Sequence, residues 1–95
     1  MKAFRFSELA LDDVRQIAEY TRQHWGLRQT AHYIDTLVDT CDQLAWFPGM
    51  GIRVVFRSRE CRYFLAGEHK IIYRQINDDL IEIARIVHTR TDRSE

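Results

Sequence analysis

The sequence of 95 residues has little of what defines several large classes of protein. One proline and four glycines are too few for a collagen-like or low-complexity chain, and a hydrophobic content of 45% excludes a disordered one. No run approaches the length of about 20 apolar residues that a membrane-spanning helix needs. Residues 1–8 lack the apolar core of a signal peptide. We therefore expect a single soluble, cytoplasmic domain over residues 1–95, with a frayed polar tail at residues 89–95.

Two cysteines and four histidines offer little to a metal ion. Cys41 and Cys61 lack a metal-ligand spacing, and Cys41 lies on the apolar stripe of a predicted helix, which favours a buried thiol over a disulfide. His24, His32 and His69 are scattered without the spacing of ligands. The sequence therefore predicts neither a metal site nor a cofactor.

The charged residues balance, with 14 basic and 14 acidic side chains, so no overall basic excess indicates nucleic-acid binding. Their distribution along the chain is uneven. Residues 1–50 hold five basic and seven acidic side chains, whereas residues 51–95 hold nine and seven. The densest basic segment places four arginines against one acid, Glu60, and these are Arg53, Arg57, Arg59 and Arg62.

The first half of the chain predicts one strand and two helices. Residues 3–6 alternate in polarity, as a short strand does, and Ser7 suits the N-cap of the helix that follows. Gly26 permits the left-handed conformation that ends a helix. A second helix is predicted over residues 28–46 and ends at a Phe-Pro-Gly-Met-Gly sequence, residues 47–51. The short connection between the helices predicts an antiparallel helix hairpin.

The second half predicts a three-stranded antiparallel meander. Strands are expected at residues 61–65 and on both sides of residues 77–79, whose short polar side chains suit a turn. Residues 52–60 contain strand-forming side chains but also three arginines, so the sequence is compatible with either a loop or an edge strand there. The predicted fold class is therefore α+β: a short N-terminal strand, an antiparallel helix hairpin and a three-stranded antiparallel β-meander.

An ordered set of short motifs resembles the ParE-type toxins of the RelE/ParE toxin-antitoxin superfamily. Each motif is weak by itself, but together they cover residues 4–92 in the family's order. They are Ala10-Leu11-Asp12-Asp13-Val14, Ile17, Tyr20, Trp25-Gly26, Ala31, Tyr33, Leu37, Leu44, Phe47-Pro48-Gly49-Met50-Gly51, Arg62, Ile72-Tyr73-Arg74, Ile81-Glu82-Ile83, Arg85-Ile86-Val87-His88, Arg90 and Asp92.

The resemblance implies a toxin that is neutralised by a cognate antitoxin, ParD-like or of another type, in a hetero-oligomer. Fold alone does not choose between the two activities of the superfamily. ParE-like members trap the cleaved-DNA complex of DNA gyrase, and RelE-like members cut mRNA on the ribosome. A third class stays open, an inactive module that only binds its antitoxin.

Metal-independent cleavage of RNA needs a general base, a general acid and cations for the phosphorane. The candidates for such an enzyme are His88, Arg62, Arg74 and Arg85. RNA-cleaving relatives follow the strand-end histidine with a tyrosine, whereas here Thr89 follows it, and Glu60 is the only carboxylate nearby. The incomplete set favours a gyrase inhibitor without catalytic residues of its own, with the ribosome-dependent endoribonuclease as the alternative.

Candidate binding residues follow from the same resemblance and from the side chains. For the target they are Arg53, Arg57, Arg59, Arg62, Arg74, Arg85, His88 and Arg90, and for the antitoxin they are Trp25, Trp46 and Phe4. Structural roles compete with these. Arg74 and Arg85 could pair with Glu82, Glu68 or backbone carbonyls, His88 could end a strand at a solvated edge, and Tyr73 is expected in the core. The default for both tryptophans is packing between the helix hairpin and the sheet.

Overall fold

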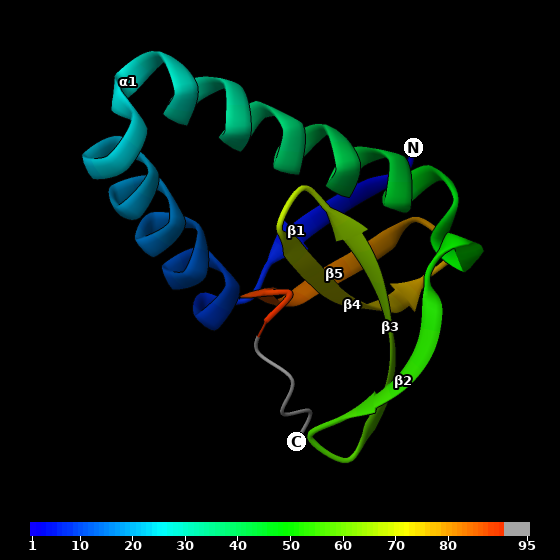
Figure 1. Cartoon of the computed structure of the whole chain (residues 1–95). Coiled ribbons are helices and arrows are strands. Elements are labelled where there is room, and N and C mark those ends of the chain that lie inside the picture. The colour runs from blue at the N-terminus through cyan, green and yellow to red at the C-terminus, as the bar shows by residue number, and fades with distance from the viewer. Residues whose placement is uncertain (91–95) are drawn as a thin grey trace.

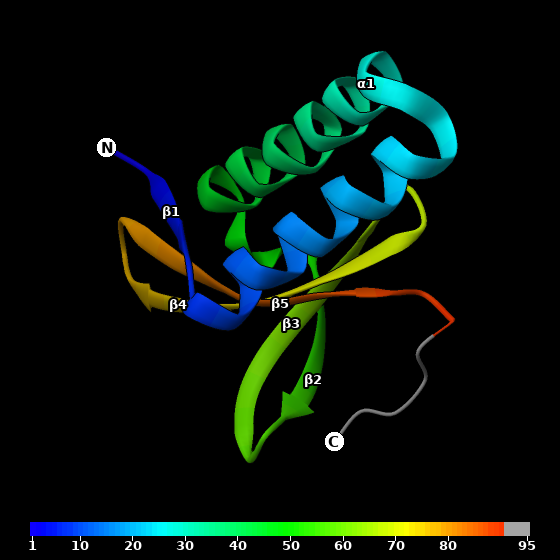
Figure 2. The same cartoon turned by 90° about the vertical axis from the view of Figure 1, so that its left-hand side faces the viewer.

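A computed structural model describes residues 1–90, which form a helical layer on one side of a five-stranded sheet (Figures 1 and 2). The elements, in chain order, are β1 (Ala3–Phe6), α1 (Glu8–Trp46), the 3-10 turn η1 (Pro48–Met50), β2 (Ile52–Phe56), β3 (Arg59–Ala66), β4 (His69–Asn77) and β5 (Leu80–His88).

The helical segment α1 consists of two arms that open from a bend (Figure 1). At its start, the Ser7 hydroxyl accepts a hydrogen bond from the backbone N–H of Ala10 at 3.0 Å, as an N-cap does. Gly26 interrupts the helix with a φ of +89°, a conformation that costs glycine little because it has no Cβ. The predicted helix hairpin with its break at Gly26 is confirmed.

The sheet has the order β1-β5-β4-β3-β2, with β1 parallel to β5 and the other pairs antiparallel. Residues 52–56, which the sequence left between a loop and an edge strand, form β2 at one edge of the sheet. They add a fourth strand to the three expected in the antiparallel meander. The α+β arrangement is confirmed, and β1 and β2 are its two edges.

The core lies between the helical arms and the sheet. Leu37, Leu44, Ile71 and Ile83 are almost completely buried, and the Tyr73 ring, expected in the core, is 1% exposed. Both cysteines are buried and form no disulfide within residues 1–90, so the prediction of a buried free thiol at Cys41 is confirmed. Burial raises the pKa of the Cys41 thiol to about 12, so this thiol stays protonated and unreactive. None of the helices within residues 1–90 is long and apolar enough to cross a membrane.

Candidate functional site

Six of the eight expected target-binding residues line two separate hollows. Arg53, Arg62 and Arg74 line the first, which has a volume of about 520 Å³ and lies over β2, β3 and β4; we call it the arginine hollow. Arg85, His88 and Arg90 line the second, of about 1000 Å³, between the first arm of α1 and β5; we call it the helix–strand groove. The structure therefore does not assemble the predicted residues into one site.

Two of the predicted residues line neither hollow. Arg57 lies in the two-residue turn that joins β2 to β3, and Arg59 is the first residue of β3. Both are exposed. They extend the basic surface from the arginine hollow towards the tip of this hairpin.

The base of the arginine hollow is fixed by hydrogen bonds to the chain that leaves α1. The Tyr73 hydroxyl donates to the carbonyl oxygen of Pro48 at 2.8 Å and accepts from the backbone N–H of Gly51 at 2.9 Å. The Arg62 guanidinium donates to the Gly51 carbonyl oxygen at 2.8 Å. A Cβ on Gly51 would lie 2.5 Å from the Tyr73 hydroxyl, so only glycine allows this approach. The resemblance had identified Gly51 by its motif but not its partners.

The arginines of the hollow are only partly neutralised. Arg74 pairs with Glu82 at 3.2 Å, which confirms one predicted structural partner, but Glu82 also contacts Arg5 at 3.4 Å. Arg53 reaches Glu60 only at 3.8 Å, and these two side chains are 74% and 84% exposed, so water screens the pair. Within residues 1–90, Arg62 has no carboxylate partner. Positive charge therefore exceeds negative charge in this hollow.

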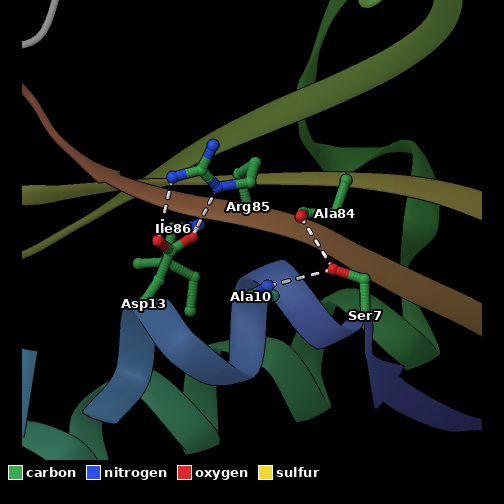
Figure 3. A network of polar contacts seen from close by, with 6 residues as sticks. All are labelled: Ser7, Ala10, Asp13, Ala84, Arg85 and Ile86. Carbon is green, nitrogen blue, oxygen red and sulfur yellow. Dashed lines mark hydrogen bonds and ion pairs between the residues drawn. The ribbon is translucent and has the colours of Figure 1, made fainter. Parts of the chain in front are cut away.

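In the helix–strand groove, Arg85 is bound to an aspartate of α1 (Figure 3). Its Nε and Nη2 donate to the two carboxylate oxygens of Asp13 at 2.8 and 2.9 Å, and the backbone N–H of Ile86 donates to the same carboxylate at 2.9 Å. The hydrogen bond that Arg85 donates to Asp13 raises the pKa of Arg85 despite its partial burial. The structure supports the structural alternative for Arg85, but its partner is Asp13 and not Glu82, Glu68 or a backbone carbonyl, the three considered from sequence.

His88 is held in a network around the turn between β3 and β4. Its Nε2 lies 3.3 Å from a Glu68 carboxylate oxygen, and its Nδ1 accepts from the backbone N–H of Arg90 at 3.1 Å. The Tyr33 hydroxyl accepts from the backbone N–H of Glu68 at 2.9 Å and lies 2.6 Å from Nδ1 of His69. Burial, and then the nearby His88, lower the pKa of His69. Both ring nitrogens of His88 therefore have partners within the protein.

The three candidate antitoxin contacts differ in exposure. Trp25, at the bend of α1, is 71% exposed, and Trp46, at its end, is 53% exposed. The expectation that both tryptophans pack between the helices and the sheet was wrong. Trp25 is among the residues that line the helix–strand groove. Phe4 packs against the core and against Phe6, with the ring centroids 5.4 Å apart.

The four residues expected in a ribonuclease site are divided between the hollows. Arg62 and Arg74 belong to one, whereas Arg85 and His88 belong to the other. A general acid acts only within hydrogen-bond reach of the atom that it protonates. His88 therefore does not share a hollow with the arginine, Arg62, whose guanidinium has no carboxylate partner.

Comparison with known proteins gives consistent results. The model of one family, described as the ParE toxin of the type II toxin-antitoxin system parDE, matches residues 4–93. The chain is 34% identical over 88 residues to Toxin ParE1 of Caulobacter vibrioides, covering 93% of this chain and 90% of that protein. It is 27% identical over 89 residues to Toxin ParE1 of Mycobacterium tuberculosis, covering 94% and 91%.

A solved structure shares the fold. It belongs to a chromosomal ParDE toxin-antitoxin system from P. aeruginosa and matches with a TM-score of 0.77 at 16% identity, covering 93% of this chain and 96% of that one. At this identity the match shows the arrangement of the strands and helices, not the role of any side chain.

Proposed function

Because the chain belongs to the ParE toxin family of type II toxin-antitoxin systems, we propose that it inhibits DNA gyrase by trapping the cleaved-DNA complex of that enzyme. The observation that carries this proposal over a ribonuclease is the bidentate bond between Arg85 and Asp13. A guanidinium whose Nε and Nη2 already bind a carboxylate has that edge occupied and its charge offset, so it is poorly placed to hold a phosphorane.

The proton-transfer groups that RNA cleavage needs support the same choice. Thr89 follows His88 and has no useful acidity at neutral pH, and the His88 ring nitrogens are engaged with Glu68 and with the backbone of Arg90. A positioned acid or base contributes about 10²–10⁴-fold to a rate, so its loss would leave cleavage very slow. Inhibition of a target by binding needs no such group.

We propose that the target is contacted by the arginine hollow together with the adjacent hairpin tip. Arginines project here from three neighbouring strands and from the turn between two of them; Arg53, Arg57 and Arg59 are exposed, whereas Arg62 and Arg74 are half-buried. Arg85, His88 and Arg90, which line the other hollow, are assigned no direct contact with gyrase. The residues assigned to the target are Arg53, Arg57, Arg59, Arg62 and Arg74.

We further propose that a cognate antitoxin, ParD-like or of another type, covers the exposed aromatic side chains in a hetero-oligomer. Trp25 and Trp46 are large apolar groups exposed to water, and such groups are common anchors of protein interfaces. The free edge of β2 offers unpaired backbone groups that an added strand can bind. Phe4 is assigned the smallest share because much of its ring already packs against the core.

The test mixes the purified protein with gyrase and supercoiled plasmid. Linear DNA that accumulates after detergent treatment supports the proposal, as does loss of supercoiling. Cleavage of ribosome-bound mRNA without any effect on gyrase would instead establish the ribonuclease. Inactivity in both assays together with tight antitoxin binding would establish an inert module.

A variant of the histidine separates the two mechanisms in cells. His88→Gln keeps a side chain of similar size but removes the titrating group. Growth inhibition should remain within about twofold of the wild type if the protein poisons gyrase, and should fall by about 10²-fold or more if His88 is a catalytic acid or base.

A further inference from the structure

Two arginines face each other in the sheet at the arginine hollow. Arg53 of β2 and Arg62 of β3 are direct cross-strand partners in the antiparallel register. Like charges placed directly opposite each other destabilise a pair of strands. Glu60 lies two residues before Arg62 on β3 and pairs with the more exposed arginine, Arg53, at 3.8 Å. The fold alone does not explain this repulsive pair.

A third arginine, Arg74, lines the same hollow from β4. Among the lining side chains within residues 1–90, three positive charges stand against the negative charge of Glu60, and Glu82, which lies outside the lining, pairs with Arg74 at 3.2 Å and with Arg5 at 3.4 Å. A concave surface with low-dielectric walls concentrates the field of such charges. The hollow therefore attracts anions more strongly than three separate surface arginines would.

The central arginine is held in place before any ligand arrives. Arg62 donates one hydrogen bond to the Gly51 carbonyl oxygen, and that segment is tied in turn to the buried Tyr73 hydroxyl. Within residues 1–90 the guanidinium makes no other hydrogen bond. A planar guanidinium with free donors matches the geometry of phosphate oxygens. Because its position is fixed, little side-chain entropy remains to be lost on binding.

From this geometry we propose that the arginine hollow binds backbone phosphates of DNA, namely the DNA that gyrase holds in the cleaved complex. This inference rests on the proposed function and adds to it that the toxin contacts the nucleic acid as well as the enzyme. The lining favours duplex DNA over single-stranded RNA. Sequence-specific RNA binding depends on aromatic side chains that stack on bases, and the only aromatic lining residue, Tyr73, is 1% exposed.

The first test uses the protein without gyrase, so that it does not depend on the proposed target. A short DNA duplex is titrated into isotopically labelled protein at low salt, and the arginine Nε–H signals are followed by NMR. The signals of Arg53, Arg62 and Arg74 should shift most, whereas that of Arg15, which pairs with Asp12 on α1, should stay in place. Equal shifts over the whole surface, or none, would overturn the proposal.

Variants provide the second readout. Each phosphate contact contributes about −0.9 to the slope of log K against log salt concentration for duplex DNA. Arg53→Gln and Arg74→Gln should each reduce the size of that slope by about 1, and Arg15→Gln, which changes the net charge equally, should not. Unchanged slopes in the first two variants would contradict the proposed contacts. A single-stranded RNA of equal length that binds about tenfold more tightly than the duplex would overturn the assignment to DNA.

Gyrase is added last, to relate the site to activity. The double variant Arg53→Gln/Arg74→Gln should lose more affinity for the gyrase–DNA complex than for gyrase alone, and it should accumulate at least about tenfold less cleaved complex, since it lacks the DNA contact. If the wild-type protein binds DNA in the hollow but leaves gyrase unaffected, the proposed function is refuted, whereas the proposed DNA-binding site still holds. A double variant that still traps the complex fully would refute this role of the site.

Discussion

The arginine hollow and the helix–strand groove both contain arginines that the sequence suggests for function, and they differ in how those arginines are partnered. In the groove, Arg85 binds both carboxylate oxygens of Asp13. In the hollow, Arg62 faces another arginine across the sheet and has no carboxylate partner within residues 1–90. An arginine with its partner supplied inside the protein serves the fold, whereas an unneutralised arginine remains available to a ligand.

The groove pair also determines how α1 lies on the sheet. Asp13 accepts three hydrogen bonds from β5, and the Ser7 hydroxyl, six residues earlier, donates to the carbonyl oxygen of Ala84 at 2.9 Å (Figure 3). These contacts join the first arm of α1 to a strand that is more than 70 residues away in sequence. The largest effects on stability are therefore expected in the groove.

The first prediction removes the anchor of the groove. Asp13→Ala leaves Arg85 without its partner and the backbone N–H of Ile86 without an acceptor, so the free energy of unfolding should fall by about 2–3 kcal/mol. The control is Asp12→Ala, which removes a neighbouring aspartate whose pair with Arg15 is mostly exposed. It should change the free energy by less than about 0.5 kcal/mol.

Urea unfolding followed by circular dichroism measures both variants. A loss of similar size in the two would show that position on α1, not the partner on β5, determines the effect. A small loss in both would show that the Arg85–Asp13 pair stabilises the fold less than its hydrogen bonds indicate. The contrast between the groove and the arginine hollow would then be weaker.

A structural feature could be predicted from this sequence when the residues that determine it are close together in the chain, and not when they are far apart. Ser7, Gly26 and Pro48 act on their own turns of the backbone, so the ends of the helices were predictable. The Asp13–Arg85 pair spans 72 residues. An acidic residue near a helix N-terminus is also explained by the helix dipole, so nothing in the sequence indicated a partner on β5.

The site was predictable only as a set of residue types. The resemblance suggested arginines and a histidine but gave no positions in space, and the structure divides them between two hollows. The tryptophans show the same limit. A periodic apolar pattern indicates which face of a helix is buried, but not where the sheet beneath it ends, so the exposure of Trp25 and Trp46 could not be inferred.

The second prediction concerns the pH dependence of the groove. His69 faces Tyr33, Glu68, Asp13 and the neighbouring His88, and burial followed by the charge of His88 lowers its pKa. The folded state thus favours neutral His69, whereas the unfolded chain takes up a proton near the ordinary value of 6.5. This contribution to stability is complete above that value and is lost as pH falls from it to the lower pKa of the folded state.

The variant His69→Asn removes the titrating group and keeps an acceptor near the Tyr33 hydroxyl. Between about pH 7.5 and 5.5, its free energy of unfolding should decrease less steeply than that of the wild type. His32→Asn, at an exposed position on α1, serves as the control and should follow the wild type. Parallel pH curves for wild type and His69→Asn would show that burial of this ring has no energetic effect, and the groove would then resemble the solvated hollow.

The last and smallest prediction concerns the hairpin tip beside the arginine hollow. Arg57 and Ser58 have φ of +52° and +66°, a left-handed conformation that suits Asn-Gly in a two-residue hairpin turn better than the residues present. Ser58→Gly and Arg57→Asn should therefore each raise the free energy of unfolding by about 0.5 kcal/mol in urea titrations. The two variants should differ in function, because only the second removes an arginine assigned to the target. If Ser58→Gly keeps the full inhibition of gyrase while Arg57→Asn weakens it, the charge of Arg57 contributes to target binding even though arginine is strained at this turn. Equal inhibition by both variants would instead confine target binding to the hollow itself.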